Sequence, residues 1–172
     1  MHVLVATDGS LDTEQVVPFA TRLAGNDGKV TVLTVVEIPR RLLSDLRRVM
    51  GEQAQVGVIA DDEYVDTPAV AHEAPPGWPG DDAMIERYLA DKRVQCAEPI
   101  AAAISETGIS AEAVVLEGEK PANLIAESVL DLDADVLVIG SHGQGLFQGV
   151  LGSTGTKLVR RSPKPVLLIR SD

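Results

Sequence analysis

The sequence contains a single cysteine, Cys96, in 172 residues. One cysteine cannot form an internal disulfide, so we expect a protein of the reducing cytoplasm. No apolar run approaches the roughly 20 residues that a membrane-spanning helix needs. The opening segment, MHVLVATDGS, lacks the basic leader of a signal peptide. These features favour a cytoplasmic location and argue against a membrane as a partner.

Aromatic and basic residues are also scarce. Aromatics make up 3% of the chain while hydrophobic residues make up 45%, so aliphatic side chains must build the interior. Such cores are common where parallel strands are buried on both faces. The 15 Lys and Arg are outnumbered by 26 Asp and Glu, which gives a formal net charge of −11. An acidic surface repels phosphate backbones, so we do not expect nucleic acid as a partner.

Five short apolar runs alternate with segments of helical periodicity. The apolar runs are 3–6, 29–37, 111–117, 134–140 and 164–170. The segments with helical spacing between and after them are 12–25, 81–108, 120–132 and 153–162. This alternation predicts one α/β domain over the whole chain, with a doubly wound five-stranded parallel sheet and helices on both faces.

Capping residues and prolines mark the expected helix boundaries. Asp12 with Gln15 resembles a capping box at the start of the first helix. Pro121 suits the first position of the third helix. Pro99 lies inside the second periodic segment and predicts a kink there. On the same segment we expect Cys96 to be a small core residue.

The segment from about residue 39 to residue 80 interrupts the alternation. It contains several prolines and two acidic clusters, with one amphipathic stretch at 42–50 that predicts a short helix. A connection of that length is usually functional or mobile. We interpret it as an insertion after the second strand, with four alternatives: a lid over a site, a contact with a dimer mate, a docking segment for a protein partner, or an unstructured spacer.

Glycine is concentrated in the loop between the fourth strand and the last helix. Six of the 15 glycines lie from Gly140 to Gly155. Because glycine raises the entropy cost of folding, so many indicate either a sharp turn or a backbone that a ligand approaches closely. The loop precedes a helix start at Ser153, where unpaired N–H groups and partial positive charge favour a phosphate. Phosphate binding is the favoured interpretation, and Thr154 and Thr156 add hydroxyl donors.

The loop does not complete the phosphate-binding motifs of other common folds. A P-loop would end in Gly-Lys-Ser/Thr, a triplet that the sequence lacks. The segment GQGLFQG is a variant of the dinucleotide fingerprint, which is a weak signal when it stands alone. A NAD(P)-dependent oxidoreductase is therefore kept as a less favoured alternative.

Four segments resemble the universal stress protein family: HVLVATDGS at 2–10, TVLTVVE at 31–37, ADVLVIGSHGQG at 134–145 and LGSTGTKLVRRSPKPVLLIR at 151–170. The resemblance covers the chain except for the insertion. It implies the strand order 3-2-1-4-5, in which the first and fourth strands are neighbours. It also implies a homodimer, commonly formed through the last strand.

Members of that family that bind ATP carry Gly-x-x-Gly, nine residues and then Gly-Ser/Thr. This chain supplies Gly140, Gly143, Gly152 and Ser153, with eight residues between Gly143 and Gly152. The loop is thus one residue shorter than the family pattern. The resemblance implies a bound ATP, with Mg or Mn held by its phosphates rather than by a metal site of protein side chains.

The resemblance also implies roles for the matching residues. Asp8 would face the ribose or the metal, Ala6 would border the nucleotide, and the Val35 backbone would meet the adenine edge. The ribose and phosphates would be wrapped by Gly140, Ser141, His142, Gly143, Gln144 and Gly145. The terminal phosphates would contact Ser153, Thr154 and Gly155, directly after Gly152. Two residues have plainer alternatives, Asp8 as a turn cap and His142 as a brace within the loop.

No catalytic set is recognisable in the sequence, because it offers neither a placed nucleophile nor a base for activating water. The chain is therefore predicted to be an ATP-binding stress-response regulator or sensor, and at most a weak ATPase. Two alternatives remain: a nucleotide-free interaction dimer of the same fold and, less favoured, the oxidoreductase. The nucleotide that co-purifies with the protein distinguishes the three.

Overall fold

The computed structural model describes residues 1–38, 48, 80–141 and 151–170. The chain divides into two compact units, one formed by residues 1–37 with 88–172 and the other by residues 38–87. The sheet and the pocket described below belong to the first unit.

Most of the second unit falls outside the described residues. Its described part is Ile38, Gly80, the beginning of one helix, α3 (Asp81–Lys92), and Arg48, which is helical. The remainder of the predicted amphipathic helix at 42–50 is not described. The insertion at about 39–80 and its four alternative roles therefore stay predictions.

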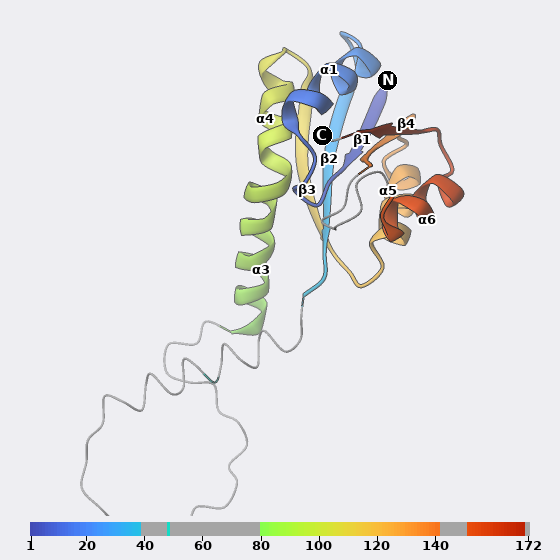
Figure 1. The fold of residues 1–172 in the computed structure, drawn as a ribbon. Helices are drawn as coiled ribbons and strands as arrows, with labels where there is room; N and C mark the ends of the chain where they lie inside the picture. The colour runs from blue at the N-terminus through green and yellow to red at the C-terminus, as the bar shows by residue number, and fades with distance from the viewer. Residues whose placement is uncertain (39–47, 49–79, 142–150, 171–172) are drawn as a thin grey trace, which may run out of the picture. The chain divides into compact units, whose positions relative to one another are not determined.

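The sheet has five parallel strands in the order β3-β2-β1-β4-β5, as predicted (Figure 1). The strands are β1 (His2–Ala6), β2 (Lys29–Val36), β3 (Ser110–Glu117), β4 (Val136–Gly140) and β5 (Val166–Ile169). At the centre of the sheet, Val5 of β1 pairs with Val32 of β2 and with Val138 of β4. Because β1 and β4 are neighbours, the strand order reverses between them, and open sheets of this class bind ligands at that point.

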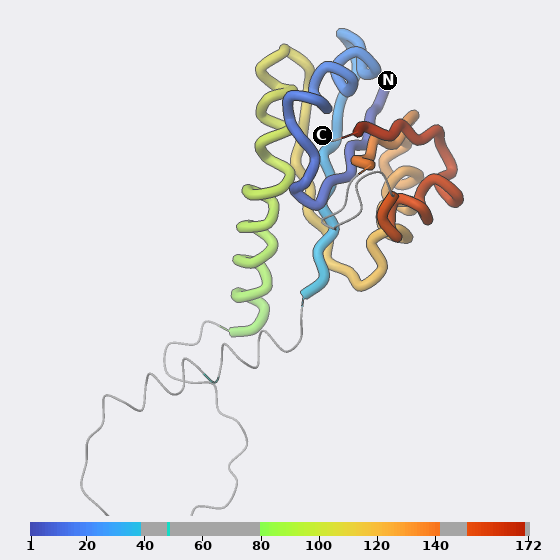
Figure 2. The backbone as a smooth tube through the Cα atoms, in the orientation of Figure 1, coloured from blue at the N-terminus to red at the C-terminus, as the bar shows by residue number. Residues whose placement is uncertain are grey.

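Helices cover both faces of the sheet, which confirms the predicted fold class. On one face lie α1 (Thr13–Ala24) and α4 (Glu98–Glu106), and on the other lie α5 (Pro121–Asp131) and α6 (Ser153–Arg161). The backbone tube in Figure 2 shows this division, with α1 and α4 on one side of the strands and the other two helices on the opposite side.

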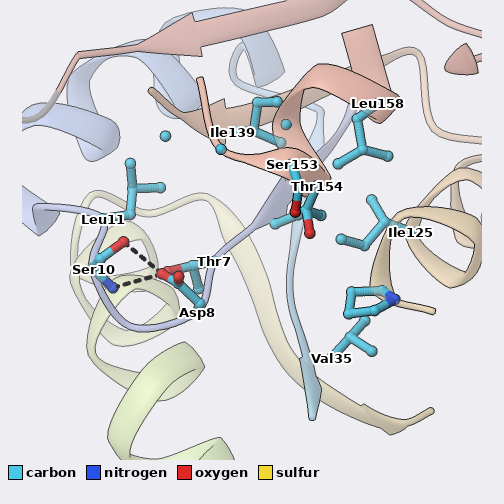
Figure 3. Close-up of a pocket in the computed structure, with 15 residues that line it drawn as sticks. Thr7, Asp8, Ser10, Leu11, Val35, Ile125, Ile139, Ser153, Thr154 and Leu158 are labelled. Carbon is cyan, nitrogen blue, oxygen red and sulfur yellow. Dashed lines mark hydrogen bonds between the residues drawn. The ribbon is translucent and has the colours of Figure 1, made fainter. Parts of the chain in front are cut away.

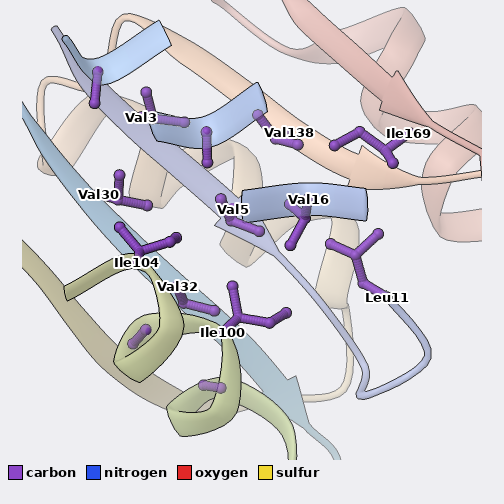
Figure 4. Packing of buried hydrophobic residues seen from close by; sticks show 14 of the residues in the cluster. Val3, Val5, Leu11, Val16, Val30, Val32, Ile100, Ile104, Val138 and Ile169 are labelled. Carbon is purple, nitrogen blue, oxygen red and sulfur yellow. The ribbon is translucent and has the colours of Figure 1, made fainter. Parts of the chain in front are cut away.

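Alternating side chains of each strand supply two cores, one on each face. The first core lies between the sheet and the helices α1 and α4 (Figure 4). Its side chains that are almost completely buried include Val3, Val5, Val16, Val30, Val32, Ile100 and Ile104. Aliphatic residues build it, as the composition predicted. Truncating one of the larger ones to alanine is expected to cost about 2–5 kcal/mol of stability.

The second core lies between the sheet and the helices α5 and α6. It contains Leu4, Ala6, Leu33, Ile125, Val129, Leu137, Ile139 and Leu158. Some of these residues also line the pocket described below, so its apolar side continues this core.

Helix α1 is capped by Asp12 as predicted, but the capping box is not completed, because Gln15 Oε1 has no hydrogen-bond partner among the described residues. Asp12 Oδ1 accepts a hydrogen bond of 2.9 Å from the amide of Glu14. At the other end Gly25 adopts a φ of 69°, and its amide donates to the carbonyl of Thr21 at 3.0 Å. Helix α5 begins with Pro121 in its first turn, also as predicted.

The second periodic segment differs from the single kinked helix that was predicted. α3 is followed by a π-helical turn, η1 (Arg93–Ala97), and then by α4. Pro99 has no N–H to donate to the carbonyl four residues before it. The amide of Glu98 donates instead to the carbonyl of Arg93, five residues before it. The Arg93 and Glu98 side chains form an ion pair of 3.0 Å over the same interval.

A chain of polar side chains, buried at His2 and Thr31, links three strands, and nothing in the sequence indicated it. His2 Nδ1 lies 2.9 Å from the carbonyl of Leu132, and its Nε2 lies 2.9 Å from Thr31 Oγ1. Thr31 Oγ1 in turn donates to Glu112 Oε1 at 2.8 Å. Because β1, β2 and β3 each supply one of the three side chains, this polar chain stabilises the sheet away from the pocket.

Candidate functional site

A pocket of about 470 Å³ lies at the carboxyl ends of β1 and β4 (Figure 3). It is lined by the turn after β1, by the ends of β2 and β4, and by residues of α5 and α6. The TDGS turn and the two described ends of the glycine-rich segment, Gly140 and Gly152, all reach it. The TDGS turn and the two described ends of the glycine-rich segment therefore share one pocket.

One wall of the pocket is the turn Thr7–Ser10, called here the Asp8 turn. Asp8 Oδ1 accepts hydrogen bonds from both the amide and the hydroxyl of Ser10, the first at 3.0 Å. Thr7 Oγ1 accepts from the amide of Gly9 at 3.0 Å. The amide of Thr7 donates to the carbonyl of Leu33 on β2 at 2.9 Å, which ties the turn to the sheet. Gly9 has a φ of 92°, a conformation that side-chain-bearing residues rarely adopt.

Another wall is the first turn of α6. Gly152 is the N-cap residue, and within the described part of the chain no side chain makes a capping hydrogen bond at this helix start. The amide of Thr156 donates to the carbonyl of Gly152 at 2.9 Å. The amides of Ser153, Thr154 and Gly155 precede that bond, so the helix itself offers them no acceptor. Donors of this kind, at the positive end of a helix, suit an anion.

The hydroxyls of the α6 wall divide into two groups. Ser153 and Thr154 line the pocket, and in Figure 3 their hydroxyls point into it. Thr156 was expected to contribute as well, but it is exposed, and its hydroxyl donates to the carbonyl of Leu151 at 3.1 Å. Residue 156 lies half a turn beyond Thr154, which turns its side chain away from the pocket.

The remaining sides of the pocket are apolar. They are formed by Val35 of β2, Ile125 of α5, Ile139 of β4 and Leu158 of α6, with Pro121 at the start of α5. The pocket therefore combines hydrogen-bond donors on the α6 side with an apolar region around β2 and α5. A ligand that carries a flat apolar group and an anionic group matches this division.

Asp8 is the one charged side chain among the described residues that line the pocket. Lys157, Arg160 and Arg161 lie on later turns of α6 and are exposed, as expected. Within the described ranges, no three His, Cys, Asp or Glu side chains are grouped so that they could hold a metal ion. An anion bound here would therefore rely on amides, hydroxyls and any cation that it carries with it.

Most of the residues singled out in the sequence come together in this pocket. Those that line it are Ala6, Asp8, Val35, Gly140, Gly152, Ser153, Thr154 and Gly155. Ser141 does not line it, because its amide continues the sheet by donating to the carbonyl of Ile169 on β5 at 2.8 Å. His142, Gly143, Gln144 and Gly145 lie outside the described residues, so their contacts with a ligand stay predictions.

Sequence reasoning missed seven of the lining residues: Thr7, Ser10, Leu11, Pro121, Ile125, Ile139 and Leu158. Thr7 and Ser10 lie on either side of Asp8 and Gly9 in the TDGS turn, where hydroxyls at both ends of a tight turn were an available signal. Pro121 and Ile125 belong to α5, and helical periodicity predicts that Ile125 is buried. That periodicity does not show which face of the sheet α5 covers or how far along the face it begins.

None of the helices in the described ranges combines the length and the apolar composition that a bilayer crossing demands.

Comparison with known proteins places the chain among relatives of one kind. The model of the universal stress protein family matches residues 1–170. A curated Thermus aquaticus protein, described as a universal stress protein in the QAH/OAS sulfhydrylase 3' region, is 34% identical over 102 residues. That alignment covers 58% of this chain and 73% of the relative.

Solved structures show the same architecture. The universal stress protein from Archaeoglobus fulgidus in complex with dAMP has a TM-score of 0.52 and 22% identity, covering 98% of this chain and 97% of the other. A universal stress protein family protein from Arabidopsis thaliana with AMP bound has a TM-score of 0.53 and 18% identity, covering 100% and 92%. The family match over nearly the whole sequence, with the Thermus relative beside it, shows that this chain belongs to the universal stress protein family.

Proposed function

We propose that this universal stress protein binds ATP in the pocket at the ends of β1 and β4 and acts as a stress-response regulator or sensor. One observation carries the proposal: the uncapped first turn of α6 opens into the same pocket as the Asp8 turn and the apolar region around Val35. The relatives whose structures contain dAMP and AMP support a nucleotide as the ligand class.

The division of the pocket suggests how the nucleotide is oriented. The adenine base lies in the apolar region, near Val35 and Ile125. The phosphates accept hydrogen bonds from the amides and hydroxyls at Ser153 and Thr154. The ribose lies between these ends, near Asp8. This orientation gives the helix start the negative charge that it favours.

A divalent cation, Mg or Mn, accompanies the ATP in this proposal. The pocket contributes one carboxylate and no cationic side chain from its described lining, so a bare triphosphate meets repulsion from Asp8. Divalent cations of this kind are commonly held by substrate phosphates with one or two carboxylates. The cation on the phosphates, facing Asp8, converts that repulsion into attraction.

The glycine-rich loop is one residue shorter than the family pattern, and its two described ends, Gly140 and Gly152, both line the pocket. It therefore begins and ends beside the proposed phosphate position, and the titration below tests whether the shorter loop still holds a triphosphate.

A homodimer through β5 belongs to the same proposal. β5 is an edge strand of the sheet, and its Leu168 side chain is 44% exposed. Exposed apolar edge strands are usually covered, and a second copy of this strand would cover it. Light scattering of the purified protein measures the dimer. The cytoplasmic location stays a prediction from the single cysteine.

The first test is chemical. Nucleotide released from the purified protein is separated by chromatography, and the emptied protein is titrated with ATP in the presence of Mg. We expect ATP or AMP in the extract and saturable binding in the titration. An extract without nucleotide, together with no binding, would support the nucleotide-free interaction dimer, and NAD(P) in the extract would support the oxidoreductase.

Two threonines of α6 provide a matched pair of variants for the same titration. Thr154→Val removes a hydroxyl that lines the pocket and is expected to weaken ATP binding about tenfold, the loss typical of a hydrogen bond to a charged group. Thr156→Val removes a hydroxyl that bonds to Leu151 outside the pocket, and its affinity should stay within about twofold of the wild type. Equal effects of the two changes would contradict the placement of the phosphates.

A further inference from the structure

The Asp8 turn rests on the π-turn η1. Cys96 Sγ lies 3.7 Å from the carbonyl oxygen of Asp8, to which its S–H donates. Gly9 approaches the same residue so closely that a Cβ built on it would lie 3.0 Å from Sγ and 3.6 Å from Cβ of Cys96. The two residues are therefore in contact, and a side chain at position 9 would press on Cys96.

The π-turn accounts for the position of Cys96. Successive residues of an α-helix are rotated by about 100°, and a π-turn contains one residue more than an α-turn, so it changes which side chains face the sheet and its loops. Two interactions hold the wide turn: the amide of Glu98 bonds to the carbonyl of Arg93, and the side chains of the same residues pair at 3.0 Å. π-turns inside α-helices are frequent at functional sites.

Cys96 does not line the pocket, but the turn that it contacts does. Asp8 and Ser10 line the pocket and are bonded to each other, so the turn moves as a unit. One of its attachments is the bond from the amide of Thr7 to Leu33 on β2. The contact of Asp8 and Gly9 with Cys96 is a second attachment. The position of the Asp8 carboxylate relative to α6 thus depends on residue 96.

We infer that Cys96 is a positioning residue for the nucleotide site: its contact with Asp8 and Gly9 sets the distance between the Asp8 turn and the start of α6. Occupancy of the pocket is then coupled to the thiol, because a ligand that fixes the turn also fixes its contact with Cys96. The inference rests on the proposed nucleotide function and adds to it a residue outside the pocket.

Three substitutions separate the parts of this contact. Cys96→Ser keeps a small donor to the Asp8 carbonyl and should bind ATP within about twofold of the wild type. Cys96→Ala removes the donor and leaves the space. Cys96→Leu pushes against Gly9, which cannot yield without moving Asp8, so ATP affinity should fall about fivefold or more, in the range usual for coupled sites.

The reactivity of the thiol provides a further measurement. If Cys96 served only the stability of the fold, ATP would not change this reactivity. Because Cys96 is the single cysteine of the chain, its rate of alkylation by N-ethylmaleimide reports one position. Saturating MgATP should slow that rate about fivefold in the wild type, a coupling of ordinary size, because a turn fixed by the ligand limits access to the thiol. The alkylated protein should in turn bind ATP more weakly, because the added group displaces the turn. As a control, Cys96→Ser with Ala102→Cys places a thiol on an exposed position of α4, and ATP should leave its rate unchanged.

The outcomes distinguish this inference from the function on which it rests. ATP-dependent protection of Cys96, absent from the Ala102→Cys control, supports it, as does weaker binding by Cys96→Leu with an unchanged melting temperature. A second outcome is that the wild type binds ATP, that its alkylation rate at Cys96 is the same with and without ATP, and that Cys96→Leu binds ATP normally. This outcome overturns the positioning role and leaves the proposed function standing. A wild-type protein that binds no nucleotide overturns both.

Discussion

The two polar walls of the pocket satisfy their hydrogen bonds in opposite ways. In the Asp8 turn, side chains and amides of the same turn bond to one another: Asp8 with Ser10, and Thr7 with Gly9. At the start of α6 the N-cap residue, Gly152, has no side chain, and no side chain of the described residues caps the helix. Among the described residues, the hydrogen bonds of the Asp8 turn are made within the turn, whereas the first amides of α6 are given no such partner.

This difference assigns different parts of binding to the two walls. The α6 wall offers donors that a ligand can satisfy, so most of the attraction for an anion is expected there. The Asp8 turn has little hydrogen-bonding capacity left in its backbone, and it contributes a fixed carboxylate instead. Substitutions in the turn should therefore act through geometry and stability, whereas substitutions at the helix start should act on affinity directly.

The largest effect is expected when the rigid turn is broken. Gly9→Val places a β-branched residue at a φ of 92° and drives its Cβ into Cys96. The strain should reduce the free energy of unfolding by about 2 kcal/mol or more. ATP binding should be lost in the same variant, because Asp8 and Ser10 move with the turn. Urea denaturation and an ATP titration measure the two effects.

Thr31→Val is the control for a loss of stability alone. It removes the hydroxyl between His2 and Glu112, at a distance from the pocket, and should cost about 1–3 kcal/mol because the buried ring nitrogen of His2 loses its partner. Its ATP affinity, measured well below the melting temperature, should equal that of the wild type. A weakened affinity in Thr31→Val would mean that general loosening, and not the turn, explains the Gly9 result.

A substitution at the start of α6 should raise the stability of the protein and lower its affinity for ATP. Gly152→Asp supplies the missing cap and a favourable charge at the helix N-terminus, so stability should rise by about 0.5 kcal/mol. No described atom lies within 4 Å of a Cβ built at this position, so the described residues leave space for the new side chain. The new carboxylate occupies the amides and repels phosphate, so ATP affinity should fall about tenfold or more.

Gly152→Ser separates the charge from the cap. It adds a capping oxygen without a negative charge and should weaken ATP binding less than Gly152→Asp does. Thermal melting and titration of both variants are the measurements. Normal ATP affinity in a stabilised Gly152→Asp protein would show that the phosphates do not lie at the start of α6.

The fold was predictable because local signals and packing agree along most of the chain. Apolar runs of strand length and capping residues such as Asp12 and Gly25 mark elements that the structure contains. The strand order came from the resemblance to the family, since alternation alone does not order five parallel strands. Arg93–Ala97 was missed because a π-turn depends on one lost amide and on the packing of α4, and neither changes the helical periodicity of the sequence.

The candidate site was predictable to the extent that its residues carry distinctive backbone chemistry. Glycine and hydroxyl residues at Gly152–Thr154, and the acidic turn at Asp8, are recognisable in the sequence alone. Cys96 was expected to be a core residue, yet it is half-buried and contacts the Asp8 turn. Contacts between segments some 88 residues apart arise from the tertiary fold, and no local sequence pattern predicts them.

The smallest and most specific effect concerns the charge of the rigid wall. Asp8→Asn keeps an oxygen that can accept from Ser10, so the turn and its stability should be preserved. Without metal, AMP should then bind about threefold more tightly, because a repulsion between two charges near a solvent-exposed site is removed. With Mg present, ATP should bind about threefold more weakly, because the cation loses a carboxylate. The gain in AMP affinity is measured by titration in the presence of a chelator, and the loss of ATP affinity by titration in the presence of Mg. A change in the same direction under both conditions would mean that Asp8 faces neither the phosphates nor their cation, and that the rigid wall acts by shape alone.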